Sequence, residues 1–137
     1  AAHATGAPRA RVRCYLTPST FARVAASPLP DDDWLRVGGI KLISDGSIQL
    51  HTACLSMPYF DRADEFGQMV IDPASLQDMV ADAHRAGTQV AIHTNGDRAI
   101  DHALDAIEHA IALTPMRDHR HRLERSWQER SRRSVGR

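Results

Sequence analysis

Short apolar strands alternate with amphipathic helical segments along this chain, and that alternation most constrains its fold. Val37–Ser44 is almost wholly apolar, which is typical of a parallel strand covered on both faces. Asp72 and Pro73 then mark the start of a helix, Gly87 marks its end, and Thr88–His93 has the pattern of the next strand. Strands that alternate with helices predict β/α units and a parallel sheet, in the α/β class.

The number of such units is too small for a closed barrel. Arg11–Thr17 and His119–Arg125 are the first and last predicted strands, a short helix is expected over Phe21–Ala26, and Ile100–Ile111 carries the stripe of a longer helix. Together these segments make roughly four β/α units, whereas a TIM-type barrel needs eight units and about 250 residues. The chain of 137 residues therefore predicts either a small open sheet or part of a barrel. The apolar strand Val37–Ser44 is unsuited to an exposed edge, so self-association is expected of a fragment.

Composition excludes several classes of partner. The 17 basic and 17 acidic residues balance, which gives no reason to expect nucleic acid or an anionic membrane. No apolar run approaches the roughly 18 residues of a membrane span, and Ala1–Pro8 lacks the pattern of a signal peptide. The two cysteines, Cys14 and Cys54, are too few for a disulfide framework. We therefore expect a cytoplasmic protein.

The candidate chemistry lies where predicted strands end. Lys41 is the one lysine among 17 basic residues and it stands inside an apolar strand, while Asp45 and Gly46 follow that strand and His93 ends the next. Because strand side chains alternate, Lys41 and His93 are expected on the face opposite the larger apolar residues. In parallel β/α folds the carboxyl ends of strands carry the chemistry.

A lysine beside a histidine at that edge suggests a metal site. Neutral imidazole is a common metal ligand, whereas the ammonium of Lys41 has no lone pair and would act only after carbamylation or as an electrostatic partner. Ordinary structural interpretations remain open. They are a hydrogen-bonded His93, an ion-paired Lys41, an Asp45–Gly46 turn and a helix cap at Asp97. We expect His119 and His121 at the surface, and His84 shows no pattern.

Three segments, in this order and spacing, resemble amidohydrolase family 3 of the amidohydrolase superfamily, a group that includes N-substituted formamide deformylase-like proteins. The first is Ile-Lys-Leu-Ile-Ser-Asp-Gly-Ser-Ile-Gln at 40–49, followed by Thr-Ala-Cys-Leu at 52–55 and Pro-Tyr at 58–59. The second is Val-Ala-Ile-His-Thr-Asn-Gly-Asp-Arg-Ala-Ile-Asp at 90–101, and the third is Arg-His-Arg-Leu-Glu at 120–124. The resemblance covers about residues 10–125.

The resemblance implies a β/α barrel that uses a divalent metal, with zinc as the expected ion, to hydrolyse carbon–nitrogen bonds other than peptide bonds. Metal-activated water would attack a small amide or formamide substrate. The resemblance also implies that His93 is a metal ligand and that Asp45 is a catalytic residue. It implies that Lys41 is a second catalytic residue, which binds the metal if carbamylated. Gly46, His51 and Tyr59 would bind the substrate.

The chain also departs from the family pattern. It has no match to the family's early His-x-His pair or to its late aspartate, and Glu124 is followed by Arg125, not by a liganding histidine. Arginine cannot ligate a metal. We therefore expect residues 1–125 to form a partial barrel domain, inactive alone, and residues 126–137 to be a disordered tail outside the family. A frameshift near codon 125 would explain the change. The alternative is a non-catalytic α/β binding module or a degenerate remnant.

Overall fold

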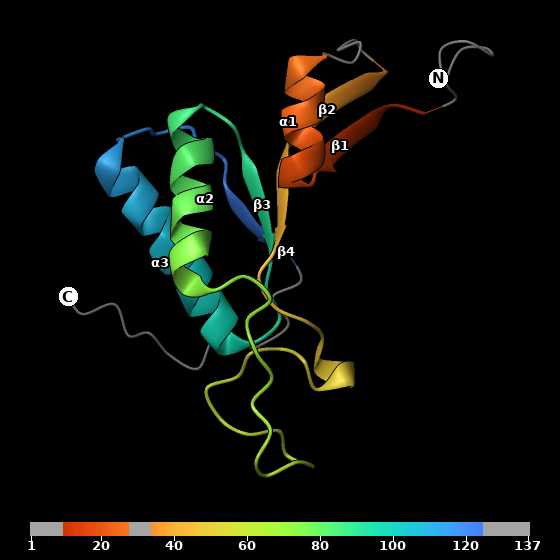
Figure 1. Ribbon diagram of the computed structural model, residues 1–137, viewed down its shortest axis with the longest axis vertical. Helices are drawn as coiled ribbons and strands as arrows, with labels where there is room; N and C mark the ends of the chain where they lie inside the picture. Colours follow the sequence, from red (N-terminus) through yellow and green to blue (C-terminus); the bar gives the residue numbers. More distant parts are fainter. Residues whose placement is uncertain (1–9, 28–33, 125–137) are drawn as a thin grey trace.

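The computed structural model of the chain describes residues 10–27 and 34–124. The predicted α/β class is confirmed, since the described residues form one sheet of four parallel strands in the order β1-β2-β3-β4. Figure 1 shows the sheet with its helices. Within the described residues the sheet is open, with β1 and β4 at its edges. The strands are β1 (Val12–Leu16), β2 (Leu35–Ile43), β3 (Val90–His93) and β4 (Arg122–Glu124).

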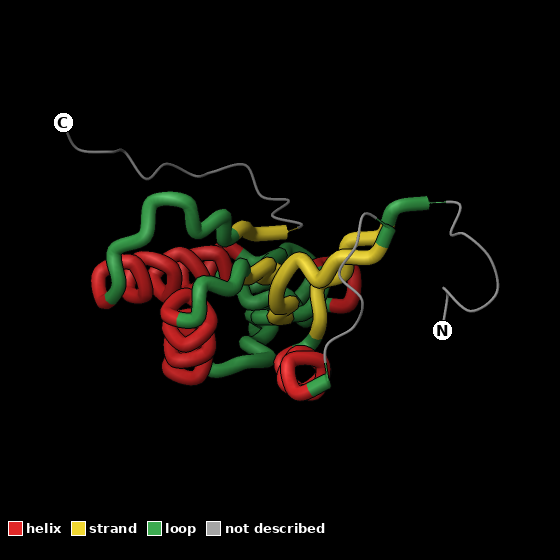
Figure 2. Tube along the Cα trace, turned by 90° about the horizontal axis from the view of Figure 1, so that it is seen from above, coloured by secondary structure: helices red, strands yellow, loops and turns green. Residues whose placement is uncertain are grey.

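Among the described residues, three α-helices connect the strands, as the alternation predicts. They are α1 (Pro18–Ala26), α2 (Pro73–Arg85) and α3 (Asp97–Leu113), and a short 3₁₀ turn, η2 (Ile48–Leu50), follows β2. Figure 2, seen from above, shows α2 and α3 beside the strands, and the residues of these two helices share one core with β2 and β3. No helix among residues 10–27 and 34–124 is long and apolar enough to cross a membrane.

The ends of α2 form as the sequence predicts. The Asp72 carboxylate accepts a hydrogen bond from the Ser75 backbone N–H at 3.0 Å, which satisfies one of the free donors of the first turn. After the helix, Gly87 adopts a φ of +67°, and the Thr88 N–H returns to the Ala83 carbonyl at 2.8 Å. This left-handed position is one that glycine occupies without steric cost.

The start of α3 differs from the prediction. The N-cap position is Gly96 and it makes no side-chain cap, so the expectation of Asp97 as the cap is wrong. The Asp97 carboxylate instead accepts hydrogen bonds from the Ser56 backbone N–H, at 2.8 Å, and from the Ser56 hydroxyl. The loop after β2 lies against this end of the helix, and the Asp97 carboxylate accepts from Ser56 of that loop as well as from the Arg98 N–H of the first turn, at 3.0 Å.

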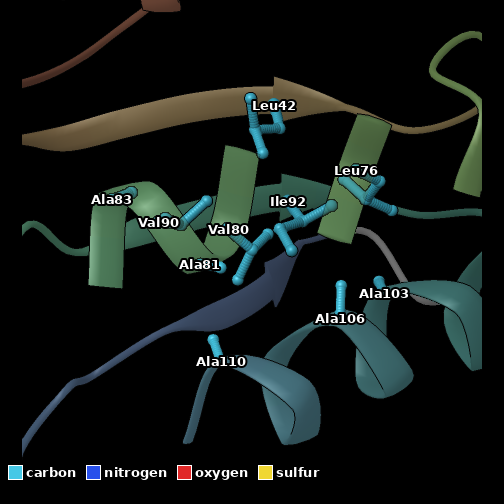
Figure 3. Packing of buried hydrophobic residues seen from close by; sticks show 10 residues of the cluster. All are labelled: Leu42, Leu76, Val80, Ala81, Ala83, Val90, Ile92, Ala103, Ala106 and Ala110. Carbon is cyan, nitrogen blue, oxygen red and sulfur yellow. The ribbon is translucent and has the colours of Figure 1, made fainter. Parts of the chain in front are cut away.

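The core lies between α2, α3 and one face of the sheet (Figure 3). Leu42, Val90 and Ile92 are at most 2% exposed, and each such buried side chain contributes about 1.5–3 kcal/mol. On α3 the buried positions are alanines, whereas the predicted isoleucine and leucine stripe is only half-buried. Small side chains let the helix lie close to its neighbours, so the helix was predicted correctly but its buried stripe was not. The buried alanines are Ala99, Ala103, Ala106 and Ala110.

The opposite face of the sheet carries the polar residues. The parallel register pairs Lys41 with Ala91, Ile43 with His93, and His93 with Glu124. Since Leu42 and Ile92 point into the helical layer, alternation puts Lys41 and His93 on the other side, in agreement with the prediction. Arg125 and the predicted tail at 126–137 lie outside the described residues.

Candidate functional site

Lys41 and Glu124 form an ion pair across the polar face of the sheet. They stand on β2 and β4, 83 residues apart, and their side chains are 25% and 33% exposed. The Arg122 guanidinium also donates to Glu124, at 2.9 Å. The hydrogen bonds from Lys41 and then Arg122 hold the pKa of Glu124 below its ordinary value, although partial burial opposes them. The ion-pair interpretation of Lys41 is thus confirmed, with a half-buried partner on β4, which is separated from β2 by β3.

His93 ends β3 and its imidazole reaches back over the end of β2. Its Nε2 lies 3.1 Å from the Gly46 carbonyl oxygen and 3.2 Å from the Asn95 Nδ2, which itself donates to the same carbonyl at 2.7 Å. Nε2–H can donate to Gly46, and in that tautomer Nδ1 carries the lone pair. Metal-binding histidines commonly donate their other ring N–H to a carbonyl in this way.

Asp45, just past the end of β2, joins two loops from a fully buried position. Its Oδ2 accepts from the backbone N–H groups of Cys54, at 3.0 Å, and Gly96, at 2.8 Å. Its Oδ1 accepts from the Asn95 N–H at 3.0 Å. Both carboxylate oxygens are therefore engaged with backbone, which gives Asp45 a structural function. A catalytic function for it stays a prediction.

The long loop after β2 forms a small core of its own. Tyr59 is buried with Ala53 and Leu55, and its hydroxyl donates to the Ala53 carbonyl at 2.9 Å. Burial raises the pKa of the Tyr59 hydroxyl above its ordinary value. His51 lies edge-on to the Tyr59 ring, with centroids 4.8 Å apart, and its Nε2 is 2.9 Å from an Asp61 carboxylate oxygen. Both residues thus hold the loop together.

Gly46 has a packing reason to be glycine, because an added Cβ would lie 2.0 Å from the Thr52 hydroxyl oxygen. Among the hydrogen bonds and ring contacts of residues 34–124, none joins His51 or Tyr59 to Lys41 or His93. The structure therefore brings Asp45, Gly46 and His93 together, but not the two loop residues with them. Substrate binding by Gly46, His51 and Tyr59 stays a prediction.

Sequence reasoning missed two participants in this site. Glu124 lies near the end of a predicted strand but was not recognised as the partner of Lys41, and Asn95 was not singled out as a site residue. The signal for Glu124 was its place at the end of the strand after β3, since strand ends meet at one edge of a parallel sheet. Asn95 had no comparable signal, because its amide acts through the Gly46 carbonyl 49 residues away.

A metal site is incomplete among the described residues. Within residues 10–27 and 34–124, no three histidine, cysteine, aspartate or glutamate side chains group closely enough to hold an ion. A catalytic metal needs about three protein ligands, and the described residues offer the imidazole of His93. The Glu124 carboxylate is not available, because it is already hydrogen-bonded to the charged side chains of Lys41 and Arg122. His93 fits the position of one ligand, and the set as a whole does not fit a complete centre.

Comparisons with known proteins point to one group. A model of the amidohydrolase family matches residues 3–127. The Arabidopsis thaliana protein LONG AFTER FAR-RED 3 is 39% identical over 92 residues, which is 67% of this chain and 16% of that protein. "Putative amidohydrolase YtcJ" of Bacillus subtilis (strain 168) is 35% identical over 75 residues, 55% of this chain and 14% of that protein. The chain thus spans about a sixth of the length of these relatives.

Two solved structures share the fold. One is an uncharacterized metal-dependent hydrolase from Pyrococcus horikoshii OT3, 37% identical with a TM-score of 0.65, and the match covers 72% of this chain and 21% of that one. The other is an uncharacterized metal-dependent hydrolase from Pyrococcus furiosus, 36% identical with a TM-score of 0.66 over 73% of this chain and 22% of that one. The four parallel strands are consistent with part of a β/α barrel.

Proposed function

The chain belongs to the amidohydrolase family, and from this premise we propose that it supplies the central β/α units of a TIM-type barrel that hydrolyses carbon–nitrogen bonds other than peptide bonds. Its substrates would be small amides or formamides, as in the formamide deformylase-like members. The observation that carries the proposal is His93, which ends β3 with Nε2 beside the Gly46 carbonyl and Nδ1 free for a ligand among the described residues. We also propose a cytoplasmic location and no nucleic-acid or membrane partner, which the balanced charge of the sequence supports.

His93 would hold a divalent metal, for which we propose zinc, through Nδ1. Such an ion lowers the pKa of its bound water toward about 7 and polarises a carbonyl group. The remaining ligands would come from parts of a complete barrel that the described residues do not include. The Gly46 carbonyl would fix the ring, since this second contact sets both tautomer and orientation.

Lys41 would assist as a charged group. Its ion pair with Glu124 engages it as an ammonium, which supports the electrostatic function over a carbamylated, metal-binding one. Asp45 would keep the Asn95–Gly96 turn, and with it His93, in place through its backbone hydrogen bonds. Because these residues provide one metal ligand, we propose that the 137-residue chain does not hydrolyse amides alone and associates with itself through its open sheet edges.

The test grafts residues 34–124 in place of the corresponding stretch of the Bacillus subtilis relative. Metal content after dialysis is measured by mass spectrometry, and turnover is measured on a panel of N-formyl and N-acyl amines. We expect the graft to retain metal, His93→Ala to lose it, and His109→Ala, an exposed histidine of α3, to change neither. Full metal content in the His93→Ala graft would contradict the proposal. Metal-dependent turnover by the purified 137-residue chain would refute its inactivity.

A further inference from the structure

Three histidines meet at the end of the sheet opposite the candidate site. His84 is 1% exposed on α2, and His119 and His121 precede β4. The ring centroids of His84 and His121 are 5.0 Å apart, and those of His119 and His121 are 4.6 Å apart. The expectation that His121 is a surface residue holds only in part, because the connection from α3 folds the half-buried ring against β3 and α2.

Hydrogen bonds through two of these rings join four elements. The Val90 backbone N–H, at the start of β3, donates to His121 Nδ1 at 3.0 Å. His121 Nε2 lies 2.8 Å from His84 Nδ1 on α2. His84 Nε2 lies 2.7 Å from the carbonyl of Thr114, the residue that ends α3. A single chain of contacts therefore runs from β3 through the β4 connection and α2 to the end of α3.

Donor and acceptor chemistry assigns every proton in this chain of contacts. The Thr114 carbonyl can only accept, so His84 Nε2 carries a hydrogen. Val90 N–H can only donate, so His121 Nδ1 offers its lone pair. His121, when neutral, then carries its hydrogen on Nε2 and donates it to His84 Nδ1. Both rings are thus neutral Nε2–H tautomers, with each polar atom paired once.

An additional proton on either ring would disrupt this arrangement. On His121 Nδ1 it would oppose the Val90 N–H, and on His84 Nδ1 it would oppose the His121 Nε2–H. We propose that His84 and His121 form a pH-sensitive lock, which ties α2, α3 and β4 to β3 while both rings are neutral and opens when either ring gains a proton. The lock lies away from Lys41 and His93, so it is independent of the chemistry proposed there.

Two nearby carboxylates, among the residues that the structure describes, are already engaged by arginines. On α2, Asp82 pairs with Arg85, and in the connection before β4, Asp118 pairs with Arg120, all of them exposed. His119 contributes a third imidazole, whose Nδ1 accepts the His121 backbone N–H at 3.0 Å. Gln89, just before β3, is neutral and donates to the Arg120 carbonyl. The contact at the end of α3 is with the neutral Thr114 carbonyl. Among the described residues, no carboxylate is hydrogen-bonded to these rings.

Electrostatics agree with this geometry. Burial, together with the neighbouring His119 and His84, lowers the pKa of His121 to about 4 from the ordinary value of 6.5. His121 is therefore neutral at neutral pH, and it gains a proton only at a lower pH than a solvated imidazole does.

The first test is long-range ¹H–¹⁵N NMR of the unmodified 137-residue chain, which reports the tautomer of each ring. We expect His84 and His121 as Nε2–H tautomers at neutral pH. As the pH falls toward about 4, the His121 signals should change together with the Val90 amide. A hydrogen on His121 Nδ1 at neutral pH would overturn the proposal, and so would protonation of His121 that leaves the Val90 amide unmoved.

Two matched variants give an independent readout. His121→Asn keeps an oxygen that can accept from Val90 but removes the titrating ring and its link to His84, and His109→Asn removes an exposed histidine of α3. The midpoint of urea unfolding is measured between pH 7 and pH 4. The acid-induced fall in midpoint should be reduced in His121→Asn and kept in His109→Asn. An equal fall in both would refute the lock, and if His121→Asn does not fold, the NMR experiment on the unmodified chain decides.

Discussion

Asp45 provides the sharpest prediction, because one buried carboxylate satisfies backbone donors from two loops. Cys54 and Gly96 donate to Oδ2, and Asn95 donates to Oδ1. A hydrogen bond to a charged group contributes about 1.5–3 kcal/mol, and each buried donor left unpaired costs about 1–3 kcal/mol. Asp45→Ala unpairs three backbone donors, so we expect it to lower the free energy of unfolding by about 4 kcal/mol or more.

Asp45→Asn keeps the side-chain volume but removes the charge and replaces one acceptor oxygen with an amide donor. The asparagine oxygen can take the place of Oδ2 and keep the bonds from Cys54 and Gly96, while its amide then opposes the Asn95 N–H. One hydrogen bond is lost and two donors face each other, so we expect a loss of about 2–3 kcal/mol, smaller than that of Asp45→Ala.

Urea unfolding followed by circular dichroism measures both variants. The matched control is Asp64→Asn, an exposed aspartate of the same loop, for which we expect a change within about 0.5 kcal/mol. If Asp45→Asn were as stable as Asp64→Asn, the carboxylate would not hold the two loops, and the structural function assigned to it here would be wrong.

Three further predictions concern packing and acid stability. Ile92→Ala should lower the free energy of unfolding by about 2–4 kcal/mol, since Ile92 is fully buried between the helices; urea titration measures this. Gly96→Ala should destabilise the protein more than Gly87→Ala in the same assay, because a Cβ at Gly96 would lie 1.9 Å from the Cys54 carbonyl oxygen. A Cβ at Gly87 would meet no atom, so its cost is limited to the backbone strain of a φ of +67°. The reverse order would contradict the packing. The lowered pKa of His121 means that the unfolded chain binds more protons, so its contribution is complete above about pH 6.5 and lost as the pH falls to about 4. Solvent screening of this half-buried ring reduces the contribution to about 2 kcal/mol, which unfolding at several pH values tests.

Local patterns predicted much of the architecture. The apolar run of β2 and the Asp72–Pro73 start of α2 needed no tertiary information, because alternation and capping depend on neighbours within a few residues. The same holds for the shared face of Lys41 and His93. The buried alanines of α3 were missed because periodicity shows which side chains are apolar, not how closely a helix approaches its neighbours.

Which side chains contact each other, in contrast, depends on the sheet register and on loops from distant parts of the sequence. The pairing of His93 with Glu124 in the register brings Lys41 and Glu124 together across 83 residues, and no local signal connects them. The sequence around Asp45 is that of an ordinary turn, and only the fold brings the loops with Cys54 and Gly96 against its carboxylate. His84 and His121 became one network only because α2 and the β4 connection both pack against β3. The sequence alone determined which faces and strand ends carry polar groups, since that follows from short-range periodicity. Only the tertiary structure decided which of those groups meet, because a hydrogen bond depends on atoms that the chain brings together from far apart.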